Sequence, residues 1–240
     1  MLVAHKVGWG VHLIGHSFDL ADWADALQVP FDPWVDQKDD EYFLRTGQFD
    51  ALANADEVRG RAVAIVEQLN AAMEIKFGSR PVRFEGVVEY RADGTRGIHM
   101  SVAVGSVEAR RRAGAIGIAI AEQEGSAPLP KESHVQQWVA ISEDHDLLAD
   151  ALIYFNRAEW FDVYKAIECL EDWVGGEDAL RAKGWVAASD IKRVKRTANS
   201  YRHRQGGKHT PPLDPISLAD ARRLLGNLIA KAFGTAKGEA

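Results

Sequence analysis

Val82-Arg-Phe-Glu-Gly-Val-Val-Glu-Tyr-Arg-Ala-Asp-Gly-Thr-Arg-Gly-Ile-His-Met100 is the stretch of sequence that decides the fold. Apolar residues alternate with charged ones over 82–90, and a second alternating run covers 98–104. Asp93-Gly94 lies between the two runs, and Asp-Gly in that position is the strongest short-range hairpin signal. The stretch therefore predicts two antiparallel strands, each with one buried face.

The sequence on both sides of this hairpin predicts further strands, and the part before it also predicts two helices. Alternating apolar residues predict strands over 3–13 and 42–46, and Ile116, Ile118 and Ile120 predict another strand after the hairpin. Residues 18–27 read as a short amphipathic helix. Residues 56–77 show a helical period in their apolar set, which comprises Val58, Ala62, Ile65, Val66, Leu69, Met73 and Phe77. Residues 1–125 are thus predicted to form an α+β domain with a mainly antiparallel sheet.

The rest of the chain predicts helices alone. Residues 126–143 read as a linker and connecting helix, since Gln123 to Pro130 is linker-like in composition and no strand pattern follows it. Residues 144–240 then read as a helical bundle. The expected helices are 132–142, 144–155, 158–174, 177–183, 188–201 and 217–233.

Several functional classes find no support in the residues. The single Cys169 excludes an intrachain disulfide and lies in an apolar helical pattern, which favours a buried structural thiol. No Cys/His cluster has metal-ligand spacing and no nucleotide loop is present, so we expect no metal and no cofactor. No signal peptide and no apolar run long enough for a bilayer are found, so we expect no membrane partner and a cytoplasmic location.

Charge is distributed unevenly along the chain. Residues 191–240 hold 11 Lys/Arg and 3 Asp/Glu, a net charge of +8, whereas residues 1–190 carry −14. An acidic body with a basic end fits a polyanion that contacts one face of the second half. A basic segment that docks on the protein's own acidic part is the alternative.

The basic segment contains the candidate site. If helix 188–201 continues for two residues, then Arg196, His203 and either Asn199 or Ser200 share one face. A guanidinium binds phosphate oxygens and an imidazole transfers protons near neutral pH. Together they suit metal-free cleavage of a phosphodiester by the internal 2′-hydroxyl. The neighbouring cations are predicted to bind nucleic acid, namely Lys192, Arg193, Lys195, Arg202, Arg204 and Lys208.

A helical bundle that carries Arg196-x6-His203 at a helix end resembles the HEPN superfamily. The resemblance implies a metal-independent endoribonuclease in which the motifs of two protomers meet across a homodimer interface. It assigns phosphate contact to Arg196, catalysis to His203 and a polar helper role to Asn199. Tyr164 and Glu168 resemble residues of a packing helix in such bundles. Residues 144–233 are also similar to uncharacterised bacterial proteins with this two-part layout.

Alternatives remain open at the motif and at the level of function. Arg202 and Arg204 have the same kind of spacing to His209, which follows Gly206-Gly207, and Thr197 stands where the family more often has Asn or Asp. The first function is an RNA-cleaving enzyme in stress or phage defence. The second is a non-catalytic interaction or dimerisation module whose N-terminal domain binds a protein or ligand. The third is an inactive nucleic-acid binder.

Overall fold

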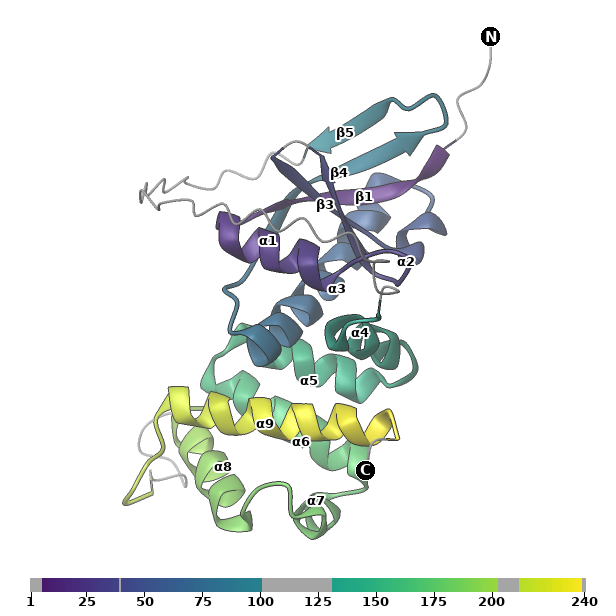
Figure 1. Cartoon of the computed structure of the whole chain (residues 1–240). Coiled ribbons are helices and arrows are strands. Elements are labelled where there is room, and N and C mark those ends of the chain that lie inside the picture. The colour runs from purple at the N-terminus through teal and green to yellow at the C-terminus, as the bar shows by residue number, and fades with distance from the viewer. Residues whose placement is uncertain (1–5, 39, 101–130, 203–211, 239–240) are drawn as a thin grey trace, which may run out of the picture.

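The computed structural model describes residues 6–38, 40–100, 131–202 and 212–238. Within these residues, one antiparallel sheet occupies the N-terminal half and the C-terminal half is helical (Figure 1). The predicted α+β class is therefore confirmed. The strand expected around Ile116 lies outside the described residues.

The sheet has the order β2-β3-β1-β4-β5, and every neighbouring pair is antiparallel. Asp93 makes the predicted β4–β5 turn, because its carboxylate accepts hydrogen bonds from the backbone N–H and hydroxyl of Thr95 at 2.9 and 2.6 Å. Strand β2 was not predicted, and its partly buried positions at the sheet edge explain its weak pattern. The strands are β1 (Lys6–Ile14), β2 (Trp34–Lys38), β3 (Glu41–Arg45), β4 (Arg83–Arg91) and β5 (Arg96–Met100).

Alternate residues of the strands face two different environments. One face packs on α1 (Ser17–Ala26) and α3 (Ala55–Phe77) through Trp9, Val11 and Leu13. The opposite face carries a separate small cluster, formed by Phe43, Val88 and Tyr90. The short helix α2 (Gly47–Asp50) follows β3.

Helix α3 has the ends that its sequence requires. The Asn54 side chain accepts hydrogen bonds from the backbone N–H groups of Asp56 and Glu57, and Gly78 ends the helix at a φ of 71°. The predicted apolar face is buried along its length, with one exception. Phe77 is 58% exposed, because it is the last residue of the helix and projects beyond the core.

All six helices predicted after residue 131 are present, with ends shifted by up to three residues. Ser133 and Gln136 form a capping box at the start of α4, and Ser217 caps α9 through the N–H of Asp220. The helices are α4 (His134–Asp144), α5 (Asp146–Arg157), α6 (Trp160–Val174), α7 (Glu177–Lys183), α8 (Ala188–Arg202) and α9 (Leu218–Ala236).

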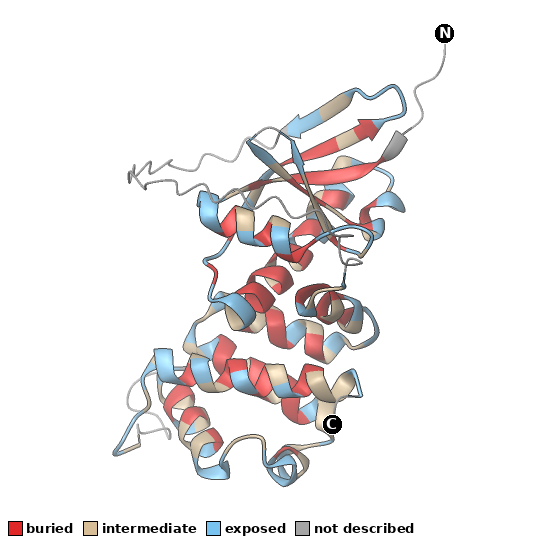
Figure 2. Ribbon diagram, in the orientation of Figure 1, coloured by how far each residue is buried: buried red, intermediate tan, exposed pale blue. Residues whose placement is uncertain are grey.

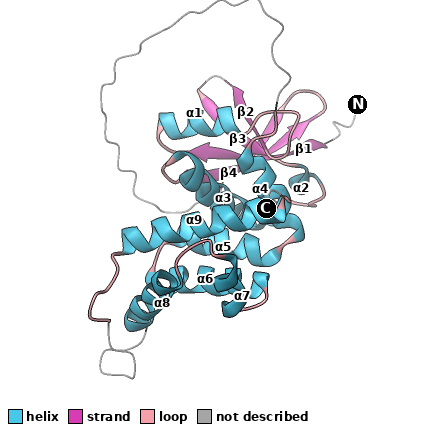
Figure 3. Cartoon of the chain, turned by 60° about the horizontal axis from the view of Figure 1, so that its bottom comes forward, coloured by secondary structure: helices cyan, strands magenta, loops and turns pink. Residues whose placement is uncertain are grey.

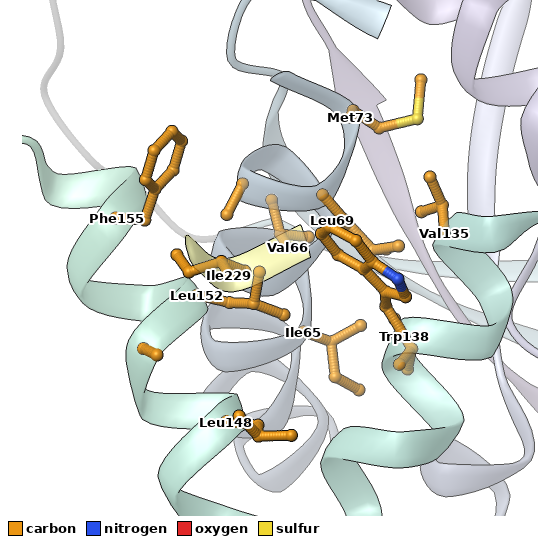
Figure 4. Packing of buried hydrophobic residues seen from close by; sticks show 14 of the residues in the cluster. Ile65, Val66, Leu69, Met73, Val135, Trp138, Leu148, Leu152, Phe155 and Ile229 are labelled. Atoms are coloured by element: carbon orange, nitrogen blue, oxygen red, sulfur yellow. The ribbon is translucent and has the colours of Figure 1, made fainter. Parts of the chain in front are cut away.

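One hydrophobic cluster runs from the sheet into the helices (Figure 2). Helix α3 joins the two halves because it packs on β1 and β4 and also on α4, α5 and α9. Figure 4 shows Leu69 of α3 among Trp138, Leu152 and Ile229 from those three helices. Since both halves share these buried contacts, α3 fixes the bundle against the sheet.

Within the described parts of the chain, no helix is long and apolar enough to cross a membrane.

Candidate functional site

Helix α8 lies at the end of the molecule that is farthest from the sheet (Figure 3). It packs on α6 through the buried side chains of Ile191, Val194 and Ala198. Residues three and four apart share one face of a helix, so these apolar positions turn Lys192 and Arg196 away from α6. Both side chains are exposed.

Arg196, the predicted phosphate-binding arginine, is free in the described part of the chain. It forms no hydrogen bond or ion pair there, and it follows Lys192 by one helical turn. Asn199, the predicted helper, is partly exposed on the next turn of the same face and also lacks a hydrogen-bond partner among the described residues. A cation without a carboxylate partner retains its full capacity to bind an anion.

Lys195, the neighbour of Arg196, has a different environment. Its ammonium group donates to both oxygens of Glu171 at 2.8 Å and to Glu177 at 3.3 Å, and it lies 5.7 Å from the centre of the Tyr164 ring. The Lys195 and Glu171 side chains are 17% and 9% exposed. Lys195, which was predicted to bind nucleic acid, is thus paired with carboxylates of its own chain.

The pKa values in this cluster follow from burial and pairing. Burial acts to lower the pKa of Lys195, but the hydrogen bonds and charges of Glu171 and Glu177 outweigh it and raise that pKa. Burial raises the pKa of Glu171, against the hydrogen bond and charge of Lys195. The hydrogen bond from Lys195 lowers the pKa of the more exposed Glu177. Lys195 is therefore held in its charged form.

Two other side chains of α8 fix the segment that leads into α9. The guanidinium of Arg193 donates to the backbone carbonyl of Asp214 and pairs with the Asp214 carboxylate, both at 2.9 Å. The hydroxyl of the fully buried Thr197 accepts a hydrogen bond from the N–H of Ile216 at 3.3 Å. Thr197, which departs from the HEPN pattern, thus has a structural contact.

The remaining predicted residues are only partly described. Arg202 is the last residue of α8. His203, Arg204 and Lys208 lie outside the described residues, and so does His209.

Sequence reasoning missed an aromatic pair at the end of α8. The rings of Tyr201 and Trp160 are stacked, with centroids 5.2 Å apart and an angle of 5° between their planes. Tyr201 is 65% exposed and lies five residues after Arg196. An aromatic residue within a basic run was the available signal, because such residues stack with nucleic-acid bases.

Neither the Cys169 thiol nor a cluster of metal-binding side chains forms a second site in the described residues. Cys169 is buried as predicted, and burial raises the pKa of its thiol to about 11, which keeps it protonated at neutral pH. Over the described ranges, no group of three or more His, Cys, Asp or Glu side chains is arranged to hold a metal ion.

Comparisons with known proteins do not narrow these possibilities: no protein-family model, no curated protein and no solved structure matches the chain.

Proposed function

We propose that the protein is a metal-independent endoribonuclease of HEPN type. Arg196 binds the scissile phosphate, His203 transfers the proton of the attacking 2′-hydroxyl, and Asn199 orients the phosphate. The observation that carries the proposal is the position of Arg196, which is exposed, in line with Lys192, and without an ion-pair partner in the described residues.

The surroundings of Arg196 support an RNA strand as its ligand. Lys192 offers a second cation one turn earlier, and the stacked pair of Trp160 and Tyr201 offers an aromatic surface at the end of α8. RNA-binding proteins combine basic side chains with aromatic rings on which bases stack. Lys192 and Arg196 thus offer two cations on one face of α8, and the aromatic pair lies farther round the same helix, on the side of α6.

The chemistry requires no metal ion at the reacting atoms. The 2′-oxygen attacks phosphorus, the bond to the 5′-oxygen breaks, and the products carry a 2′,3′-cyclic phosphate and a 5′-hydroxyl. A guanidinium stabilises negative charge on the phosphoryl oxygens as this charge develops. The proposal includes a cytoplasmic homodimer formed through the helical bundle, which brings the motifs of two protomers together.

Incubation of the full chain with a structured RNA in EDTA tests the proposal. We expect cleavage, cyclic phosphate ends, and at least a hundredfold loss of rate in Arg196→Ala and His203→Ala. Arg223→Ala is the matched control, because Arg223 is also exposed on a helix of this half but pairs with Asp220 at 2.8 Å. The absence of cleavage, or equal rates in all the variants, would contradict the proposal.

A non-catalytic interaction module is the second candidate. Of the three predicted RNA-contacting cations whose side chains are described, two are paired within the chain, Arg193 with Asp214 and Lys195 with Glu171. Fewer free cations mean fewer phosphate contacts and a weaker dependence of binding on salt. This candidate predicts neither RNA cleavage nor a steep loss of RNA affinity between 50 and 200 mM salt, the range over which counterion release is normally measured.

A further inference from the structure

The sheet face that points away from α1 and α3 is strongly concave. Arg96 of β5 and Asp36 of β2 form an ion pair of 3.7 Å, although β2 and β5 are the two edges of the sheet. In a flat sheet, four strand spacings would separate these edges by about 19 Å. An arginine and an aspartate cannot bridge that distance, so the edges curl toward each other over this face.

Strand β1, at the centre of the sheet, has the features that such curvature needs. Its pairing with β4 is irregular at two places, between Lys6 and Gly8 and between His12 and Leu13. Such irregularities bend a sheet and increase its twist. A Cβ atom on Gly10 would lie 3.0 Å from the Tyr90 ring and 3.3 Å from the Arg45 side chain. Glycine at this position therefore lets both side chains lie close against the floor of the concave face.

Aromatic rings contact both arginines of the concave face, and Arg96 also pairs with Asp36. The Arg45 guanidinium carbon lies 4.2 Å from the centre of the Tyr90 ring and 5.2 Å from that of Trp34. The Arg96 guanidinium carbon lies 4.7 Å from the Phe43 ring and 5.1 Å from the Tyr90 ring. A ring attracts a cation through its π face and leaves the N–H groups of the guanidinium available.

Two polar atoms on this face lack the hydrogen bonds that burial normally requires. The Tyr90 hydroxyl and Nε of Arg45 are buried without a hydrogen-bond partner among the described residues, and Tyr90 as a whole is 9% exposed. Burial raises the pKa of the Tyr90 phenol, with the charge of Arg96 opposing it, so the hydroxyl keeps its proton at neutral pH. Two donors without a hydrogen bond thus lie on the face that carries Arg45 and Arg96.

We propose that the concave face of the sheet binds a phosphomonoester anion, held by Arg45, Arg96 and the Tyr90 hydroxyl. A phosphomonoester carries almost two negative charges near neutral pH and has three terminal oxygens that accept hydrogen bonds. Among the described residues, Asp36 is the one carboxylate in an ion pair with these arginines, at 3.7 Å, so positive charge remains for the ligand. The site lies in the sheet half and functions independently of Arg196.

A small ligand fits this face better than an RNA strand does. Asp36 lies at one edge of the concavity, and the Glu85 carboxylate lies 3.1 Å from His12, which contacts Phe43 on the same face. A continuous phosphate backbone would pass these carboxylates, whereas one phosphate group can stay between the arginines. Because the two edges of the sheet lie close together, there is little room between them for a long RNA strand.

Calorimetric titration of the full chain with inorganic phosphate, adenosine monophosphate and adenosine tests the site. We expect saturable binding of the first two with a dissociation constant below about 1 mM, and no binding of adenosine. Arg45→Gln and Tyr90→Phe should each weaken binding at least tenfold. Arg83→Gln is the matched control and should bind normally, since Arg83 is an exposed arginine on the same strand as Tyr90.

Tyr90→Phe keeps the test valid if Arg45→Gln fails to fold, because it removes a hydroxyl that has no partner in the free protein. Equal affinities in the wild type, Tyr90→Phe and Arg83→Gln would overturn the proposal, as would a lack of phosphate binding. Binding of a short single-stranded RNA that depends on Arg45, without binding of either phosphate probe, would also overturn it in favour of a nucleic-acid surface.

Discussion

Lys195 in the helical half and Arg45 in the sheet half are held in different ways. In the helical half, Lys195 pairs with Glu171 and Glu177, and its three N–H donors have acceptors. In the sheet half, Arg45 rests on the rings of Trp34 and Tyr90, and no carboxylate of the described residues lies within ion-pair distance. Pairing with carboxylates uses the hydrogen-bonding capacity of a cation, whereas stacking on rings preserves it. The comparison therefore separates cations that stabilise the fold from cations that are available to a ligand.

Lys195 and Arg196, which are neighbours in α8, show the same contrast. Substitution of Lys195 should have the largest effect on stability. Lys195→Met should lower the free energy of unfolding by roughly 3 kcal/mol, since it leaves the mostly buried Glu171 without its partner. Arg196→Met should change it by less than about 0.5 kcal/mol, as is usual for an exposed residue. Urea denaturation of both variants measures the difference. Equal losses would show that the two cations do not differ in their structural role.

The pH dependence of the stability lost in Lys195→Met tests whether the charge of Lys195 is the source of that stability. The pKa of Lys195 is raised in the folded protein, so its contribution to stability is fully present below its ordinary pKa of 10.5. This contribution is lost as the pH rises through the folded value. The difference in unfolding free energy between the wild type and Lys195→Met should thus be constant from pH 7 to 9 and shrink above about pH 10.5. A difference that does not shrink would indicate packing rather than charge as the source of stability.

Gly10→Ala tests the sheet side of the comparison with a smaller expected effect. The new methyl group would lie 3.0 Å from the Tyr90 ring, so the ring and Arg45 must shift. We expect a loss of about 1 to 2 kcal/mol in the free energy of unfolding, within the usual range for overpacking. Gly60→Ala in α3 is the control, because a methyl group there has no atom within 4 Å apart from its chain neighbours and the backbone of its own helix. This control should be neutral or slightly more stable, and an equal loss in both variants would contradict the close packing of the concave face.

Tyr90→Phe should have the smallest effect on the ligand-free protein. Its hydroxyl is buried without a hydrogen bond to the described residues, so the substitution removes the cost of burying an unpaired polar group and breaks no hydrogen bond there. We expect the free energy of unfolding to stay the same or to rise by up to about 1 kcal/mol, measured by urea denaturation in phosphate-free buffer. A loss of more than about 1 kcal/mol would show that the hydroxyl has a partner in solution.

Much of the fold could be predicted because its signals are local. The Asp93-Gly94 turn, the helical period of α3 and the caps of α4 and α9 each depend on residues close in sequence. Strand β2 could not be predicted, since an edge strand buries little and shows little alternation. For the candidate site, the helical register that turns Lys192 and Arg196 outward was available from the sequence. The roles of Arg196, Asn199 and His203 stay predictions.

The sequence by itself determined the α+β class, most of the elements and the basic character of α8. Only the tertiary structure decided which cations are free, because Glu171 and Glu177 reach Lys195 from 24 and 18 residues away. It also decided the curvature that brings Asp36 and Arg96 together from opposite edges of the sheet. Local propensity depends on neighbouring residues, whereas pairing and burial of charge depend on which distant elements pack together. For that reason a single sequence predicts elements well and sites poorly.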